Sequence, residues 1–272
     1  MHVITGATGN VGAEVVRLLA AAGEQVTAVS RNPAPQPEGV RHVAADLGDP
    51  ASLRAAFAGA SALFLLVAGP EPEAVLKVAG EAGIRRVVLL SSQGAGTRPD
   101  RYAHPAAFEE AVRASGLEWT ILRPSGFYTN TLAWAGSIRA HQTAAAPFAD
   151  VALPFIDPAD IAEVAAAVLR RDGHAGRTYV LTGPEAITPR ERAAAIGRAF
   201  GGEVRFTEQS REEARTEMSR FMPAEVVEAT LGVLGTPVAA ERQVSPDVAA
   251  VLGRAPRTFA DWAARHAAAF RP

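Results

Sequence analysis

The first half of the chain alternates short apolar segments rich in β-branched residues with Ala- and Leu-rich segments of helical period. We expect strands at residues 2–5, 26–30, 40–44, 63–68, 87–90 and 120–122. Residues 62–67 and 87–90 are apolar at every position, as in strands that are buried on both faces of a parallel sheet. This alternation predicts an α/β fold, a doubly wound parallel sheet with helices on both faces.

The pattern changes after Pro124. Residues 127–154 read as a loop rich in aromatic side chains, and a strongly helical segment follows from Asp157 to Arg171. Two later helices begin at Thr188 and Ser210, each with a glutamate three residues on, which is the spacing of a capping box. We therefore expect two parts, a sheet core at residues 1–125, to which 155–182 return, and a smaller, mostly helical C-terminal lobe within 126–272.

A glycine-rich turn, Gly6 to Gly12, connects the first expected strand to a helix that runs to about Ala22. Gly6 permits the tight turn, Gly9 lets the backbone approach a pyrophosphate, and Gly12 lets the helix pack close to the strand. The helix N-terminus adds N–H groups and a partial positive charge. The glycines could merely permit a turn, but this position between strand and helix predicts a dinucleotide site, with contacts also from Thr8, Asn10 and Val11.

The Gly-x-x-Gly-x-x-Gly spacing resembles that of the extended and atypical short-chain dehydrogenase/reductase families, and residues 4–33 are similar to the NmrA-like branch. The likeness covers nearly the full chain and continues in four segments: Ala45–Asp49, Leu90–Gly94, Ser115–Pro124 and Asp157–Ala162. It implies a Rossmann-type NAD(P)-binding core at 1–125 and a substrate-binding lobe at 126–272.

The end of the second expected strand predicts which cofactor is preferred. An acidic residue there would accept hydrogen bonds from the ribose of NAD, but the chain carries Ser30, Arg31 and Asn32 instead. A guanidinium attracts a 2′-phosphate, so we expect NADP(H) to be preferred over NAD(H). The alternative is a solvated arginine at a strand end.

The resemblance implies further cofactor contacts at the ends of the other strands. It places the adenine at Asp46 and Leu47, although Asp46 could equally be a turn residue. It places the riboses or pyrophosphate beside three small residues, Val67, Ala68 and Gly69. It places the nicotinamide near Ser91 and Pro124.

The proton donor is harder to identify. Most short-chain reductases use a Tyr-x-x-x-Lys pair, but Tyr102 is followed four residues on by Ala106, and Lys77 is the sole lysine of the sequence. The remaining candidates each have a structural alternative: Ser92 could bond backbone, His104 could begin a helix, and Tyr128 could wall a pocket.

Aromatic and polar side chains follow the sixth strand within one short span, with Phe127, Asn130 and Trp134 beside Tyr128. Flat aromatic walls with a few polar groups suit a small, planar, conjugated substrate. The same residues could instead form the hydrophobic core of the lobe.

Composition and charge exclude several classes of protein. The 272 residues include no cysteine, and the six histidines lack metal-ligand spacing, so we expect no metal. The 27 basic and 29 acidic residues nearly cancel, so no global field favours nucleic acid. The longest uncharged apolar stretch, residues 55–70, is too short to span a membrane. We expect a cytoplasmic protein without a nucleic-acid or membrane partner, in which an apolar helix face could also support a homodimer.

These observations predict an NADPH-dependent oxidoreductase that transfers hydride to a quinone-like or aromatic, polyketide-type ketone without a metal or flavin. Two alternatives stay open. One is a tailoring enzyme of natural-product or antibiotic biosynthesis that performs reductive coupling or dearomatisation of an aromatic polyketide. The other, motivated by the absent Tyr-Lys pair, is a non-catalytic NAD(P)-binding sensor that regulates a protein partner.

Overall fold

The computed structural model describes residues 1–32 and 34–271, so Pro33 of the similar segment 4–33 lies outside the described residues. The chain divides into two compact units. The first consists of Met1–Pro124, Pro158–Leu181 and Asp247–Arg254, and the second consists of Ser125–Asp157, Thr182–Pro246 and the chain from Ala255 onward. Residues 247–254, which the sequence analysis assigns to the lobe, therefore cluster with the sheet instead.

Seven parallel strands form the sheet of the first unit, in the order β3-β2-β1-β4-β5-β6-β8. The strands are β1 (His2–Thr5), β2 (Val26–Ser30), β3 (Arg41–Ala44), β4 (Ala62–Leu66), β5 (Arg86–Leu90), β6 (Glu118–Pro124) and β8 (Arg177–Leu181). Each of the six predicted strands overlaps an observed one, and the Rossmann-type doubly wound α/β fold is confirmed. The order reverses between β1 and β4, the switch point at which such sheets bind ligands.

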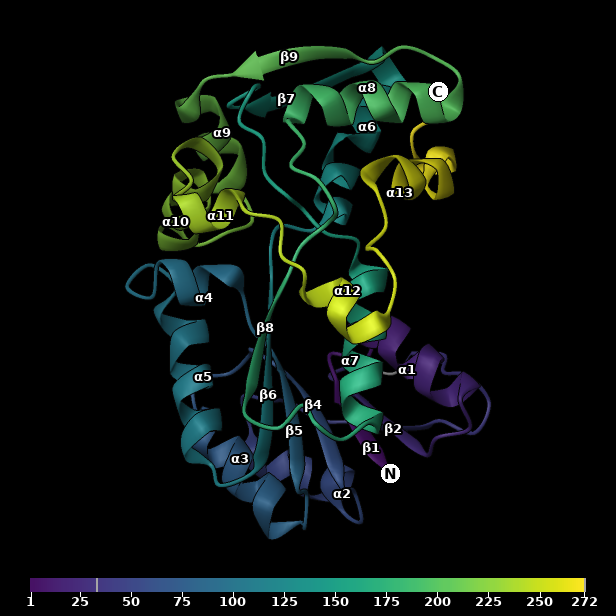
Figure 1. Ribbon diagram of the computed structural model, residues 1–272, viewed down its shortest axis with the longest axis vertical. Helices are drawn as coiled ribbons and strands as arrows, with labels where there is room; N and C mark the ends of the chain where they lie inside the picture. Colours follow the sequence, from purple (N-terminus) through teal and green to yellow (C-terminus); the bar gives the residue numbers. More distant parts are fainter. Residues whose placement is uncertain (33, 272) are drawn as a thin grey trace. The chain divides into compact units, whose positions relative to one another are not determined.

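Helices cover both faces of this sheet (Figure 1). On one face, α1 (Gly12–Ala21) packs against α7 (Pro158–Arg170), which also contacts β4, β5 and β6. On the other face, α3 (Pro72–Glu81) packs against α5 (Ala103–Ala114) and α2 (Arg54–Phe57). The remaining helices of the unit are η1 (Pro50–Leu53), α4 (Gln93–Thr97) and α12 (Asp247–Leu252), the last packed on α7 and β8.

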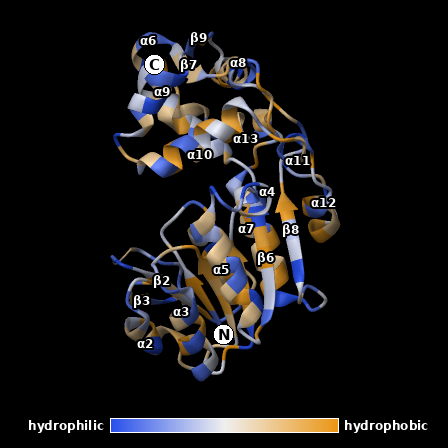
Figure 2. Cartoon of the chain, turned by 90° about the vertical axis from the view of Figure 1, so that its left-hand side faces the viewer, coloured by the Kyte–Doolittle hydropathy of each residue, from blue (hydrophilic) through white to orange (hydrophobic). Residues whose placement is uncertain are grey.

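The core of the first unit follows the continuous apolar pattern of its strands. Every residue of β1 and β2 is buried, and the strands seen behind α5 in Figure 2 carry the hydrophobic colour. Phe57, Leu63 and Phe108 are completely buried between the sheet and its helices. Burial of one such side chain stabilises a fold by about 1.5–3 kcal/mol, so this core fixes the register of the strands.

The second unit combines a two-stranded parallel sheet with short helices. The strands are β7 (Thr143–Pro147) and β9 (Arg205–Gln209). The helices are η2 (Tyr128–Trp134), α6 (Ala135–His141), α8 (Pro189–Phe200), α9 (Arg211–Met218), α10 (Ala224–Gly235), α11 (Ala239–Arg242), α13 (Phe259–Arg265) and η3 (Ala267–Ala269). The interpretation of 127–154 as a loop is therefore wrong, because this segment contains η2, α6 and β7.

Aromatic packing and helix caps organise the second unit. Tyr128 meets Phe259 edge to face with 5.1 Å between ring centroids, and Trp262 lies 5.3 Å from Phe259. Both predicted capping boxes are present, at Thr188 before α8 and at Ser210 before α9. The unit thus has its own aromatic core.

No helix within residues 1–32 and 34–271 is both long and apolar enough to cross a membrane. Over the same residues, no three His, Asp or Glu side chains gather into a group that could hold a metal ion.

Candidate active site

The glycine turn after β1 is tightly packed at both of its ends. Gly6 has a φ of +63°, a conformation that favours glycine. A Cβ on Gly12, the first residue of α1, would lie 2.2 Å from the carbonyl oxygen of Gly6. The N–H of Ala7 donates to the carbonyl of Val29 in β2 at 3.1 Å. These contacts require glycine at both positions for the fold itself.

The middle of the same turn is open. A Cβ on Gly9 would lie 3.4 Å from the Gly6 carbonyl oxygen, which the fold can accommodate, and Thr8, Gly9 and Asn10 are exposed. The turn leads directly into the N-terminus of α1, where the helix dipole places a partial positive charge. A glycine where the fold tolerates a side chain, at the N-terminus of a helix, fits the close approach of a dinucleotide pyrophosphate. Val11, by contrast, is buried.

The turns after β3 and β4 touch each other. Gly69 has a φ of +82°, and a Cβ there would lie 2.5 Å from the carbonyl oxygen of Leu47. Asp46 is exposed, and its Oδ1 accepts a hydrogen bond from the N–H of Gly48 at 2.9 Å. Asp46 is therefore a turn residue that keeps its second carboxylate oxygen for other partners. The two small residues before Gly69, Val67 and Ala68, are half-buried.

The end of β2 carries an internal hydrogen-bond chain. The Ser30 hydroxyl donates to the carbonyl of Asn32 at 2.6 Å and lies 2.8 Å from Nε2 of His42 in β3. Because its proton goes to the carbonyl, the ring of His42 must be the donor in the second bond. Ser30 therefore shapes the turn, while Arg31 and Asn32 are exposed.

A buried ion network lies beneath the ends of β5 and β6. Ser91 Oγ donates to Glu109 Oε1 at 2.6 Å, Arg123 donates to both carboxylate oxygens at 2.9 and 2.6 Å, and Arg113 donates at 2.8 Å. Burial alone would raise the pKa of Glu109, but the hydrogen bonds from Arg123, Ser91 and Arg113 outweigh it and lower that pKa. The Ser91 hydroxyl therefore directs its hydrogen to Glu109 and can offer a ligand only an acceptor oxygen. Pro124, also predicted here, is buried at the end of β6.

Two of the three proton-donor candidates lie in the first unit. Ser92 caps α4, where its hydroxyl oxygen accepts from the N–H of Gly94 at 3.2 Å. Nε2 of His104 lies 2.8 Å from the carbonyl oxygen of Gly69. A carbonyl only accepts, so Nε2 holds the proton, and His104 can release one from Nδ1 only when the ring is cationic. His104 also ties α5 to the turn after β4.

The third candidate, Tyr128, belongs to the aromatic core of the second unit. Its side chain is completely buried, and its hydroxyl donates to the carbonyl of Arg257 at 3.4 Å. A Cβ on Gly183 would lie 2.4 Å from that hydroxyl. These contacts favour the structural alternative for Tyr128.

The predicted substrate residues lie on one segment of the second unit. Phe127 pairs with Ile156 in an isolated bridge, and Asn130 is exposed. Trp134 is half-buried, and the guanidinium of Arg192 lies 5.5 Å from its ring centroid. An aromatic wall and a cation thus come together at Trp134.

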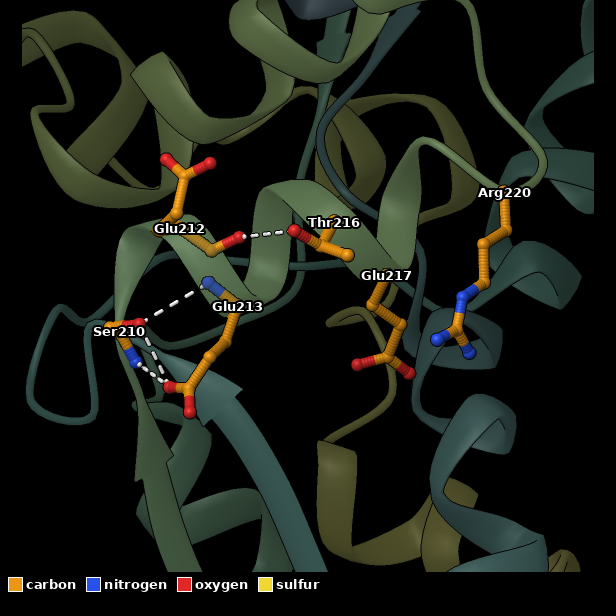
Figure 3. Close-up of a pocket in the computed structure, with 6 residues that line it drawn as sticks. All are labelled: Ser210, Glu212, Glu213, Thr216, Glu217 and Arg220. Atoms are coloured by element: carbon orange, nitrogen blue, oxygen red, sulfur yellow. Dashed lines mark hydrogen bonds between the residues drawn. The ribbon is translucent and has the colours of Figure 1, made fainter.

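A separate depression lies along α9 in the second unit (Figure 3). Its polar groups largely satisfy one another, since Ser210 and Glu213 form the capping box and Thr216 donates to the carbonyl of Glu212 at 3.0 Å. None of the predicted site residues lines it, and its side chains are mostly glutamates: Ser210, Glu212, Glu213, Thr216, Glu217 and Arg220. An acidic surface of this kind does not suit an anionic or apolar substrate.

Three residues that sequence reasoning missed now stand out. Glu109 precedes Arg113 by four residues on α5, a spacing that could have indicated a helical ion pair. His42 gave no signal, since its partner lies on the neighbouring strand. Arg192 occupies the apolar stripe of α8, because positions 189, 192, 193 and 196 follow helical period and are all buried. An arginine in such a stripe is a detectable anomaly.

Comparison with known proteins agrees with this geometry. A family model described as NAD(P)H-binding matches residues 6–172, which run from the glycine turn to just past α7. The (4-alkanoyl-5-oxo-2,5-dihydrofuran-3-yl)methyl phosphate reductase of Streptomyces griseus is 40% identical to this chain over 289 residues, covering 100% of both chains. The NAD(P)H azoreductase of Xenophilus azovorans is 33% identical over 285 residues, covering 99% of both.

A solved structure extends the likeness to three dimensions. The NADPH-dependent quinone oxidoreductase of Escherichia coli, solved with NADPH, superposes with a TM-score of 0.81 at 27% identity and covers 97% of this chain and 99% of its own. The relatives named here are reductases, so we set the non-catalytic sensor alternative aside. The resemblance to NmrA-like, atypical short-chain dehydrogenases/reductases is confirmed: the chain belongs to the NAD(P)H-binding family and is an NAD(P)H-dependent oxidoreductase.

Proposed function

We propose that the protein transfers hydride from NADPH to an electron-poor acceptor whose double bond is conjugated to a carbonyl group, such as a quinone or an unsaturated lactone. The observation that carries this proposal is that the two serines at the carboxyl end of β5 are engaged in hydrogen bonds of the fold. The Ser91 hydroxyl donates a hydrogen bond to Glu109, and the Ser92 hydroxyl accepts one as the cap of α4. The full sequence also has no Tyr-x-x-x-Lys pair, since Lys77 stands alone.

The chemistry of a conjugated acceptor suits such a site. Bound NADPH would supply the hydride. The acceptor carbon gains the hydride, and the electron pair of the double bond moves onto the carbonyl oxygen. The resulting enolate or hydroquinone anion then takes a proton from water. An isolated ketone would instead form a localised alkoxide, which calls for a general acid in the transition state.

The names of the relatives support this class of acceptor. In a 4-alkanoyl-5-oxo-2,5-dihydrofuran, the ring double bond is conjugated both to the lactone carbonyl and to the alkanoyl carbonyl. Quinones and azo compounds, named in the other two relatives, are also conjugated acceptors. A role of this protein in antibiotic biosynthesis stays a second candidate, because one of its relatives comes from Streptomyces griseus.

The preference for NADPH over NADH is part of the same proposal. Arg31 is exposed at the end of β2, and residues 30–32 include no carboxylate that would repel a 2′-phosphate. Loss of one charge-assisted hydrogen bond costs about 1.5–3 kcal/mol, so Arg31→Ala should reduce the ratio of NADH to NADPH dissociation constants roughly tenfold or more. Arg85→Ala is the control, because this exposed residue lies just before β5, at the amino end of the strand rather than the carboxyl end. An unchanged ratio in Arg31→Ala would refute the assignment.

A panel of acceptors tests the reaction class. Under anaerobic conditions, NADPH oxidation is followed with a 2-acylbutenolide, a 1,4-quinone and cyclohexanone. We expect turnover with the first two and none with the third. The variant Gly9→Val, which places a side chain where the pyrophosphate would lie, should abolish turnover. Reduction of cyclohexanone at a comparable rate would contradict the proposal.

A further inference from the structure

Arg192 of α8 is a buried cation whose charge no carboxylate neutralises in the part of the chain that the structure describes. The residue is only 6% exposed, and its Nε has no hydrogen-bond partner there. Burial lowers its pKa to about 10, an effect that the nearby Tyr128 opposes, so the guanidinium stays charged at neutral pH. The fold therefore holds a permanent positive charge inside the second unit.

Three other buried charges among the described residues are paired. Buried Glu109 forms ion pairs with two arginines. Buried Asp160 pairs with Arg254 at 2.7 Å, and buried Asp157 pairs with Arg265. Removing a charge from water without a counter-ion is strongly unfavourable. Arg192 departs from this pattern, which indicates that its counter-ion is not part of the chain.

The surroundings of Arg192 suit a ligand. The guanidinium carbon lies 4.5 Å from the ring centroid of Phe155 and 5.5 Å from that of Trp134. Aromatic faces attract a cation, but they cannot accept the five N–H bonds that a guanidinium directs in its plane. A phosphate can accept two of them at once in a bidentate arrangement.

We propose that Arg192 binds the phosphate monoester of a phosphorylated substrate, within the second unit and beside Trp134 and Phe155. This inference rests on the proposed function, because the phosphorylated molecule is the hydride acceptor. The substrate named for the Streptomyces griseus relative carries a methyl phosphate next to its conjugated ring, which matches a cation beside aromatic walls. The conjugated ring and the phosphate would then be recognised by different groups.

The test compares two acceptors that differ only in the phosphate, a 2-acyl-3-(hydroxymethyl)butenolide and its phosphate ester. The wild-type protein should reduce the ester with a kcat/KM about 100-fold higher, as expected for a buried bidentate charge pair. Arg192→Met keeps an unbranched, flexible side chain but removes the guanidinium group and its charge. It should remove this preference by lowering the kcat/KM of the ester much more than that of the unphosphorylated acceptor, while the dissociation constant of NADPH stays unchanged.

A matched control and a stability measurement separate binding from packing. Arg190, on the same helix, also stacks on an aromatic ring, 5.3 Å from the centroid of Phe206, but it is exposed and paired with Asp150 at 3.1 Å. Arg190→Met should keep the preference for the ester. Arg192→Met should have an unchanged or raised Tm, because it removes an unpaired buried charge. A lowered Tm with an intact preference for the ester would show that Arg192 is a packing residue and overturn the inference.

The remaining outcomes distinguish this inference from the proposed function. If the wild-type protein reduces both acceptors equally well, the inference fails and the proposed function stands. If it reduces neither, the proposed function fails, and the inference is decided by ligand-induced stabilisation. In that case the ester must raise the Tm of the wild-type protein but not that of Arg192→Met, and absence of this difference overturns the inference.

Discussion

Replacement of Glu109 by glutamine removes the carboxylate that holds Ser91, Arg113 and Arg123 together beneath the ends of β5 and β6. The glutamate side chain is 2% exposed, and it accepts two hydrogen bonds from Arg123 and one each from Arg113 and Ser91. Glutamine keeps the shape of the side chain but turns one acceptor oxygen into an N–H₂ group that faces arginine donors. The variant therefore tests the charge of the network rather than its volume.

The exposures of the partners set the expected cost. Breaking a fully buried ion pair costs about 3–5 kcal/mol, mainly because the remaining charge is left without a partner. Here the side chains of Arg123 and Arg113 are 21% and 38% exposed, so water can solvate them in part. We expect a loss of about 3 kcal/mol in the free energy of unfolding, the lower end of that range, and a fall in Tm of roughly 6–12 °C.

Urea and thermal unfolding of Glu109→Gln measure this loss, with the exposed neighbour Glu110→Gln as the control. A Tm within about 2 °C of the wild type, equivalent to less than about 1 kcal/mol, would refute the reasoning. The pH dependence gives an independent check. The pKa of Glu109 in the fold is below its ordinary value, so the network stabilises the fold at neutral pH and loses that stabilisation as the pH falls through the folded-state pKa. Glu109→Gln should therefore lose less stability on acidification than the wild type.

Three further predictions address the cofactor site and the second unit. Gly12→Ala should fail to fold, because its Cβ would lie 2.2 Å from a backbone carbonyl oxygen. In Gly9→Ala the Cβ would lie 3.4 Å from the same oxygen, so this variant should keep the wild-type Tm but lose NADPH affinity in calorimetric titration. An unchanged NADPH affinity in Gly9→Ala would argue against a dinucleotide at this turn. His42→Ala removes the hydrogen bond to the hydroxyl at the end of β2 and should weaken NADPH binding more than NADH binding, with equal weakening of both as the contrary result. Thr188→Ala removes the capping box of α8 and should cost about 1 kcal/mol in urea unfolding, and no loss would mean that other contacts hold the start of the helix.

The sheet was predictable because its signals are local. Continuous apolar segments mark the strands, and positive φ values at Gly23, Gly59, Gly83 and Gly116 coincide with the glycines that follow helical segments. The segment 127–154 was not predictable in the same way. β7 has the sequence Thr-Ala-Ala-Ala-Pro, which lacks a strand pattern, and it is a strand because it pairs with β9 far along the chain.

The same distinction explains the candidate site. The glycine turn and the residues at the end of β2 are contiguous in sequence, and the structure keeps them together. The burial of Tyr128 depends on α13, which follows it by more than a hundred residues, so no local pattern could separate a proton donor from a core tyrosine. The network around Glu109 likewise joins two strand ends to a helix, and only the packed fold shows that the Ser91 hydroxyl donates its hydrogen bond to Glu109.

The central claim is direct hydride transfer from NADPH to a conjugated carbon, followed by protonation from water. Its most direct test is the reduction of a 2-acylbutenolide with NADPH deuterated at either position of C4, followed by mass spectrometry and NMR of the product. We predict that one of the two labelled forms delivers a single deuterium to the carbon β to the carbonyls, while unlabelled NADPH in heavy water labels only the adjacent carbon. A reduced product without deuterium at the β carbon from either labelled form would contradict the claim.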